Sequence, residues 1–286
     1  MEKFYEIAGI PICVSANPEI MYEDDRELAP FRTGEISNAV RYRFDVVNSL
    51  PAGDRKRELY RAPDLAVFGG VGGEEYRYVG TVSERPENGY MMAHYMGDAV
   101  DVVLNRGEAS CVAVRCVLNA LAMEHLAVSN GGVILHCAYI IYNGQAVLFT
   151  APSGGGKSTQ AELWRKYLGA EIINGDRAII VPGGGMTAAY SLPYAGSSGI
   201  CKNKTAPVKA IIYLRQAKKD SAVRLRGGYA FSRVWEGCFV NTWNRDDVAR
   251  AADAVSAVVG STPVFMLECT PERSAADTML ELLEQK

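Results

Sequence analysis

The residues with the clearest capacity for chemistry lie in one short stretch, Ala151-Pro-Ser-Gly-Gly-Gly-Lys-Ser-Thr159. Consecutive glycines let neighbouring backbone N–H groups turn toward one point, because glycine accepts the left-handed backbone angles that such a curl requires. Lys157 would place a positive charge beside terminal phosphates, and the hydroxyl of Ser158 suits a magnesium ion. The stretch therefore predicts a phosphate-binding loop. The residues expected to hold the nucleotide are Pro152, Ser153, Gly154, Gly155, Gly156, Lys157, Ser158 and Thr159.

The segments on either side decide between such a loop and a chance glycine run in a flexible connection. Val133–Tyr142 and Gln145–Thr150 are apolar runs rich in β-forming residues, and the Asn143-Gly144 pair between them predicts a two-residue hairpin turn. Apolar residues recur at helical spacing in Thr159–Tyr167, and Glu171–Ile173 begins a further strand. This order of strand, hairpin, strand, loop and helix is the context that a phosphate-binding loop requires.

His136 is one of three histidines in the chain, and the hairpin fixes its position. In a two-residue turn Tyr142 faces Gln145, so paired residue numbers add to 287 (142 + 145) and His136 comes opposite Ala151. Because cross-strand neighbours lie about 5 Å apart, we expect His136 beside the start of the loop. Two interpretations stay open, a catalytic histidine and a structural histidine inside an apolar strand.

Asp176 is the second candidate for catalysis. It follows Lys157 by 19 positions (176 − 157), which leaves room for one short helix and one strand. A carboxylate at the end of that strand could bind magnesium or take a proton from an incoming hydroxyl. The alternative is a solvated turn residue. The next residue, Arg177, could pair with a phosphate or form a surface salt bridge.

These residues together resemble a known family. The run from His136 through the glycine-rich stretch to Ile173-Asn-Gly-Asp-Arg177 is similar to the catalytic domain of HPr serine kinase/phosphorylase and its small relatives. Leu192–Ile200 and Ala206–Ala217 resemble downstream segments of those proteins, and the similarity extends over about residues 108–286. The resemblance implies a phosphoenolpyruvate-carboxykinase-like fold, in which the phosphate loop follows an antiparallel hairpin.

The resemblance also implies roles for single residues. Lys157 corresponds to the loop lysine of that family, Ser158 to its magnesium-binding hydroxyl, and Asp176 to the aspartate that exchanges a proton with the acceptor. The chain departs from the family pattern at Ala151, which replaces the first glycine of the loop, and at Gly175, which replaces the first residue of an Asp-Asp pair. It therefore looks like a small relative and not like an HPr kinase proper.

We accordingly expect an ATP- and magnesium-dependent kinase that transfers the γ-phosphoryl group to a hydroxyl. Asp176, His136 and Lys157 are its expected catalytic residues, and Ser158 and Asp176 its expected magnesium ligands. By resemblance the acceptor is a serine, in a protein, a peptide or a small molecule. Two other classes stay open: a regulatory or accessory module that binds ATP without transferring phosphate, and a carboxykinase-type enzyme that acts on a carboxylic acid.

Composition frames this expectation. A chain of 286 residues with 48% hydrophobic and 22% charged residues can bury a large core, and a net charge of −3 argues against nucleic-acid or anionic membrane partners. The N-terminus lacks a signal-peptide pattern, and no apolar run approaches about 20 residues, so we expect a cytoplasmic protein. Seven cysteines without a Cys-x-x-Cys pair predict free thiols. A homo-oligomer is left open.

The chain is expected to form two domains of the α/β class with a mixed sheet. Residues 1–100 would be a β-rich domain of unknown role with antiparallel strands, and residues 101–286 the nucleotide-binding catalytic domain. A long amphipathic helix is expected over Glu108–Ser129. The strands expected in the first domain are Ile7–Val14, Val40–Val46, Leu65–Phe68, Glu75–Val82 and Tyr90–Tyr95.

Overall fold

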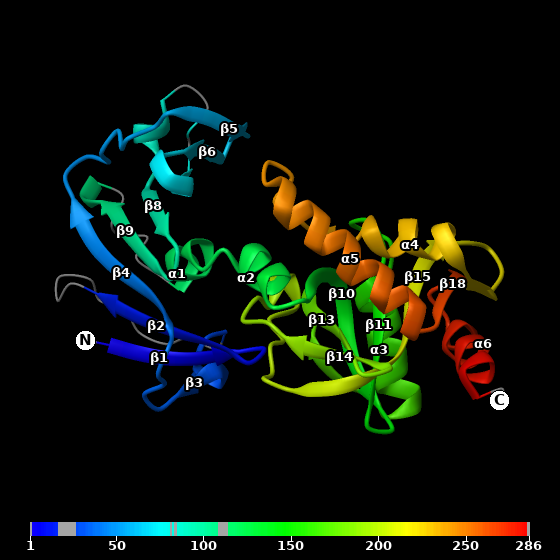
Figure 1. Cartoon of the computed structure of the whole chain (residues 1–286). Coiled ribbons are helices and arrows are strands. Elements are labelled where there is room, and N and C mark those ends of the chain that lie inside the picture. Colours follow the sequence, from blue (N-terminus) through cyan, green and yellow to red (C-terminus); the bar gives the residue numbers. More distant parts are fainter. Residues whose placement is uncertain (1, 17–26, 81, 83–84, 108–113, 285–286) are drawn as a thin grey trace. The chain divides into compact units, whose positions relative to one another are not determined.

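The computed structural model describes residues 2–16, 27–80, 82, 85–107 and 114–284, and the chain divides into two compact units, Met1–Ala122 and Met123–Lys286 (Figure 1). The division falls later than the boundary near residue 100 that the apolar pattern suggests. The reason is that Ala99–Asn105 is a strand in the sheet of the first unit. Each unit holds a mixed sheet, so the protein belongs to the mixed α/β class.

The first unit is built on one sheet, in which nine strands of the described residues follow the order β3-β1-β2-β4-β9-β8-β7-β6-β5. The pairs β2–β4 and β4–β9 are parallel and the other pairs are antiparallel, so the expectation of a purely antiparallel domain is wrong. Its elements are β1 (Glu2–Ile7), β2 (Ile10–Ala16), β3 (Arg32–Thr33), β4 (Val40–Val47), β5 (Arg57–Arg61), β6 (Leu65–Gly69), β7 (Glu75–Val79), β8 (Met91–Met96), β9 (Ala99–Asn105) and α1 (Val114–Ala120).

Three of the strands expected in this unit are confirmed to within one residue at each end, namely β4, β6 and β8. The expected strand Ile7–Val14 is wrong, because the chain reverses at Ala8 (φ 54°) and Gly9 (φ 78°) to form the β1–β2 hairpin. The expected strand that begins at Glu75 ends three residues early, before Gly80 (φ 115°). Residues with left-handed φ values end these strands. At these positions such values can be predicted from the sequence only where the residue is glycine.

The long helix expected over Glu108–Ser129 is also wrong as a single element. Its first residues, 108–113, lie outside the described part of the chain, and the rest forms two helices, α1 and α2 (Met123–Ser129). Ala122 separates them with a left-handed φ of 50°, which interrupts the helical hydrogen bonds. The division between the two units coincides with this break.

The second unit is a sheet covered by helices on both faces. Its strands follow the order β11-β10-β13-β14-β15-β18-β16, with β12 and β17 also paired to β10 and with β11 paired to β15 in parallel. Its elements after α2 are β10 (Val133–Tyr142), β11 (Gln145–Thr150), α3 (Lys157–Leu168), β12 (Glu171–Asn174), β13 (Arg177–Gly183), β14 (Met186–Ser191), β15 (Thr205–Gln216), β16 (Ser221–Leu225), α4 (Gly227–Trp235), β17 (Cys238–Phe239), α5 (Arg245–Ser261), β18 (Val264–Cys269) and α6 (Arg273–Glu284).

Alternate residues of β10 belong to two different cores. Leu135 and Tyr139 pack into the core that includes α4 and α5, whereas Ala138 and Ile140 pack into the core that includes α3 and α6. Both faces of the strand are therefore removed from water, which explains why its sequence is almost continuously apolar. Burying each large aliphatic side chain in this way contributes about 1.5–3 kcal/mol.

The hairpin that leads to the glycine-rich stretch is confirmed residue by residue. Asn143 and Gly144 both have left-handed φ values, 48° and 73°, as a two-residue hairpin turn requires. The register runs from Tyr142 opposite Gln145 to Cys137 opposite Thr150, as the residue numbering predicts. The glycine-rich stretch thus starts directly after an antiparallel pair of strands.

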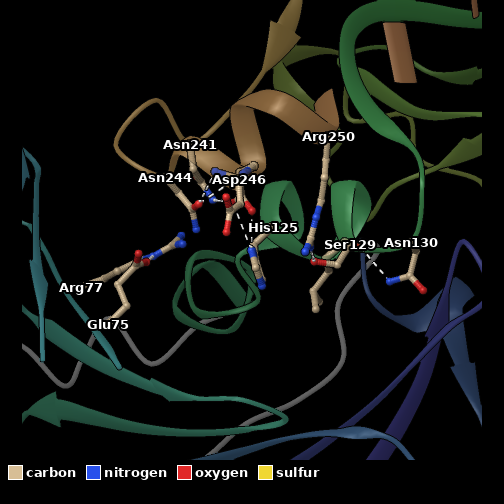
Figure 2. Close-up of polar contacts among 11 residues, drawn as sticks. Glu75, Arg77, His125, Ser129, Asn130, Asn241, Asn244, Asp246 and Arg250 are labelled. Atoms are coloured by element: carbon tan, nitrogen blue, oxygen red, sulfur yellow. Dashed lines mark hydrogen bonds and ion pairs between the residues drawn. The ribbon is translucent and has the colours of Figure 1, made fainter. Parts of the chain in front are cut away.

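A polar cluster joins α2 to the start of α5 (Figure 2). The Nδ1 atom of His125 lies 2.9 Å from Oδ1 of Asp247, whose side chain is almost fully buried, and Asn241 donates to the other carboxylate oxygen at 3.0 Å. The side chain of Asn244 caps α5 by accepting hydrogen bonds from the amides of Asp246 and Asp247. These contacts fix the α2–α5 packing through a buried charge.

Two general features complete the fold. Among the described residues no helix has both the length and the apolar character needed to cross a membrane. Free thiols are confirmed for the cysteines in the described part of the chain, which are Cys13, Cys116, Cys137, Cys201, Cys238 and Cys269.

Candidate functional site

The candidate site lies where β10 changes its neighbours on both edges. Up to His136, β10 pairs with β13 on one edge and with β17 on the other. From Cys137 onward, β12 replaces β13 on the first edge, and β11 replaces β17 on the second. At the change the amide of His136 donates to Gly237 O at 2.7 Å, and the amide of Cys137 donates to Asp176 O at 3.0 Å.

The glycine-rich loop, residues 151–156, leaves the end of β11 at this point. Gly154 and Gly156 have left-handed φ values of 75° and 100°, which L-residues rarely adopt. Gly155 is required for a different reason, because a β-carbon there would lie 2.6 Å from the β-carbon of Ala151. Gln216 holds the loop from β15 by donating to Gly154 O at 2.9 Å. The loop therefore requires glycine at these three positions for two structural reasons.

Lys157 is the first residue of α3, and its side chain folds back into the loop. Its Nζ atom donates to Ala151 O at 3.0 Å and lies 3.5 Å from Pro152 O. Burial holds the pKa of this ammonium group below its ordinary value of 10.5. The loop carbonyls thus hold a partly desolvated positive charge at the place where phosphates are expected.

The remaining loop residues face solvent. Pro152, Ser153, Ser158 and Thr159 are exposed, and no side chain caps the first turn of α3, so its leading N–H groups can meet an anion. In the described part of the chain, no group of three or more His, Cys, Asp or Glu side chains could hold a metal ion. Magnesium bound by Ser158 and Asp176 would need phosphate oxygens as well, and proteins usually hold this ion in that way.

Asp176 stands in the two-residue interruption between β12 and β13. Its amide and the amide of Arg177 both donate to the Oδ1 atom of Asn174, at 2.8 Å and 3.0 Å, and Asn174 is itself fully buried. These two hydrogen bonds fix the backbone at Asp176. The carboxylate accepts a hydrogen bond from Arg177 Nε through Oδ2, and its Oδ1 lies 3.9 Å from His136 Nε2.

His136 lies among charges from three segments. Its side chain is 31% exposed, and Thr150 at the end of β11 donates to its backbone oxygen at 3.0 Å. The pKa of the imidazole is lowered by burial first and then by the charges of Lys157 and Arg177, while Asp176 acts in the opposite direction. The predicted pairing of His136 with Ala151 does not form, since the β10–β11 ladder ends one residue earlier.

The sequence alone does not decide whether Arg177 pairs with a phosphate or forms a surface salt bridge. Arg177 opens β13 directly opposite His136, and its Cζ atom lies 4.5 Å from the ring centroid of Tyr194 and 4.4 Å from that of Phe239. Its ion pair with Asp176 is four-fifths buried, so it is not a surface salt bridge. The two aromatic rings come from distant segments, and no local pattern in the sequence announces them.

The turn that contains Ser198 covers Gly175. A β-carbon on Gly175 would lie 2.6 Å from the β-carbon of Ser198, and a β-carbon on Gly196 would lie 2.9 Å from that of Asp176. Farther along, Lys202 and Lys204 both bind the carboxylate of Glu171, at 2.8 Å and 2.7 Å. The segment after β14 therefore packs closely on Asp176, and its two lysines are paired.

These features define a mixed α/β protein in which a glycine-rich loop joins a strand to a helix beside a His–Asp–Arg cluster. A family model described as SynChlorMet cassette protein ScmC matches residues 103–269, more than half of the 286-residue chain. The chain belongs to the ScmC family. This family is a different one from the HPr serine kinase/phosphorylase family that the motif resembles.

Similarity to solved structures is weak. The HPr(Ser) kinase/phosphatase from Coxiella burnetii matches with a TM-score of 0.29 and 10% sequence identity, over 52% of this chain and 87% of that chain. A search of curated proteins finds no match.

Proposed function

We propose that the chain is an ATP- and magnesium-dependent phosphotransferase that moves the γ-phosphoryl group to a hydroxyl, with a serine in a protein, peptide or small molecule as the expected acceptor. The observation that carries this proposal is the convergence of Lys157, His136 and Asp176 beside an uncapped helix start. Phosphoryl transfer requires charge and positioning of this kind.

The loop and α3 would bind the nucleotide. The N–H groups of Gly154, Gly156 and the first turn of α3 would hold the phosphates, and the Lys157 ammonium would move from the loop carbonyls to the terminal phosphates. Magnesium, when bound by Ser158 and Asp176 together with phosphate oxygens, supplies charge neutralisation. The antiparallel β10–β11 hairpin before the loop supports the phosphoenolpyruvate-carboxykinase-like arrangement as part of the same proposal.

Asp176 would act on the acceptor. Its carboxylate takes the proton of the acceptor hydroxyl while that oxygen forms its bond to the γ-phosphorus and ADP departs. The pKa of His136 is lowered by burial, which favours the neutral imidazole. A neutral imidazole can donate one hydrogen bond without adding charge. Arg177 fixes the orientation of the Asp176 carboxylate through the hydrogen bond from Nε.

One observation favours a second candidate, a nucleotide-binding accessory module without phosphotransfer. Ser198 fills the space beside Gly175, so the site carries one carboxylate where the family pattern that it resembles carries two. A site with a single carboxylate would bind magnesium less tightly. No feature of the described residues favours a carboxykinase-type enzyme in the same way.

The test uses γ-labelled ATP with the full-length chain, first for nucleotide binding and then for transfer of label to a peptide and small-molecule mixture. Lys157→Ala should abolish nucleotide binding, and Asp176→Asn should retain binding and lose transfer. Lys166→Ala, an exposed lysine on the same helix, is the matched control and should behave like the wild type. Transfer by Asp176→Asn at the wild-type rate would refute the catalytic assignment. Binding without any transfer by the wild type would favour the accessory module.

A further inference from the structure

Arg177 is held in one orientation by three contacts. Its guanidinium lies over the rings of Tyr194 and Phe239, at 4.5 Å and 4.4 Å from their centroids, and its Nε donates to Asp176 Oδ2 at 2.6 Å. Only 20% of the side chain is exposed. Cation–π contacts of a partly desolvated guanidinium are favourable and restrict its rotation. The group is therefore rigid before any ligand binds.

These contacts use only part of its hydrogen-bonding capacity. A guanidinium has five N–H donors in a planar fork, and one of them, on Nε, is committed to Asp176. Within the described residues, the N–H groups on the two Nη atoms donate no hydrogen bond. A fixed guanidinium with a free edge is suited to bind carboxylate or phosphate through two parallel hydrogen bonds.

Arg177 belongs to a different segment from the groups expected to bind the nucleotide phosphates. The loop and Lys157 supply the groups suited to those phosphates, whereas Arg177 belongs to β13 and is tied to the carboxylate that would receive the proton of the acceptor. Arg177 forms an ion pair with Asp176 and lies opposite His136 in the β10–β13 ladder. The Nη groups of Arg177 could therefore serve the acceptor, while the loop serves the nucleotide.

We propose that Arg177 binds an anionic group of the phosphoryl acceptor, so that the acceptor is a hydroxyl compound with a carboxylate or phosphate close to the reactive hydroxyl. This inference rests on the proposed function and narrows its substrate class. An acceptor without a nearby anion that displaces water from Arg177 leaves its Nη groups without a hydrogen-bond partner, which is unfavourable for a mostly buried donor.

The test measures anion binding by the full-length, 15N-labelled chain in solution. Acetate and inorganic phosphate are titrated at constant ionic strength, and the Nε–H resonance of Arg177 is identified by its absence from Arg177→Lys. We expect a saturable shift with at least one of the two anions. Arg233 is the matched control, because it lies over Tyr213 and Tyr229 at 5.2 Å and 5.1 Å and pairs with Glu236 outside the site. The Nε–H resonance of Arg233 should show no saturable shift in the same titrations.

Two further variants separate this inference from the proposed function. Lys157→Ala should lose nucleotide binding and keep the saturable Arg177 shift, because the anion does not need the loop. Tyr194→Leu keeps the charge and removes one ring contact, and should weaken anion binding about tenfold. If the Arg177 resonance shifts no more than that of Arg233, the inference is wrong even where labelled ATP shows transfer. If Arg177 binds anions and no transfer occurs, only the kinase proposal fails.

Discussion

Gly175 and Ser198 cannot both carry a full side chain on the present backbone, since a β-carbon on Gly175 would lie 2.6 Å from the β-carbon of Ser198. Ser198 is itself fixed. Its hydroxyl donates to Ala195 O at 2.8 Å and accepts from the amide of Ile200 at 3.2 Å. The glycine at position 175 and the turn at Ser198 therefore depend on each other.

Gly175→Asp should destabilise the protein by about 1–3 kcal/mol, because the new side chain overpacks the turn at Ser198. The free energy of unfolding, measured in urea, checks this. Adding Ser198→Gly should recover part of the loss, since it removes the clashing β-carbon. Gly228→Asp is the control, because a β-carbon there meets nothing within 4 Å. Equal stability of Gly175→Asp and the wild type would contradict the prediction.

Stability should depend on pH through His136. Its pKa in the folded protein is below the ordinary 6.5, because burial and the charges of Lys157 and Arg177 disfavour the imidazolium. Between the two values the unfolded chain binds more protons, so the free energy of unfolding falls as pH drops below about 6.5. His136→Gln should lose less stability than the wild type between pH 7.5 and 5.5 in urea unfolding. Identical pH profiles would show that His136 does not titrate in this way.

Asp247→Ala should cost about 1.5–3 kcal/mol, because it removes hydrogen bonds that a buried carboxylate makes with His125 and Asn241. Asp246→Ala offers a close comparison. Asp246 is the preceding residue, its amide is capped by the same Asn244, and its side chain is exposed. Its loss should cost less than about 1 kcal/mol. Thermal or urea unfolding of both variants checks the prediction, and equal losses would show that the buried pair adds nothing.

Trp164→Phe should be much milder than Trp164→Ala. The indole is fully buried edge-on to Tyr142 and Phe149, with ring centroids 5.4 Å and 5.8 Å away. Among the described residues its N–H has no hydrogen-bond partner, so phenylalanine removes an unpaired donor while it keeps most of the packing. Alanine should cost about 3–5 kcal/mol through the cavity. Urea unfolding should place Trp164→Phe at less than half that loss.

The local parts of the site could be read from the sequence. The β10–β11 hairpin, its register and the start of α3 follow from Asn143-Gly144 and from the glycines of the loop, because turn chemistry acts over a few residues. The packing around Asp176 could not be read in that way. Tyr194 and Phe239 reach Arg177 across 17 and 62 positions (194 − 177 and 239 − 177), and only the folded sheet brings them together.

The same distinction explains the errors in the first unit. Alternation of apolar residues indicates strands but does not indicate which strands pair or in which direction. The parallel β2–β4 and β4–β9 pairs therefore cannot be predicted from it. Single left-handed residues were also missed where the residue is an alanine. Ala8 and Ala122 end elements with φ values of 54° and 50°, and alanine gives no warning of such angles.

The change of partners in the middle of β10 has a consequence for dynamics. The amides of His136 and Cys137 donate to Gly237, directly before β17, and to Asp176, in the β12–β13 turn. These two acceptors lie on opposite edges of a strand that is buried on both faces. We therefore expect these two amides to exchange with solvent deuterium only when the unit opens as a whole. The backbone under the His136–Asp176 pair should then exchange more slowly than the amides of Gly154 and Gly156 in the neighbouring loop.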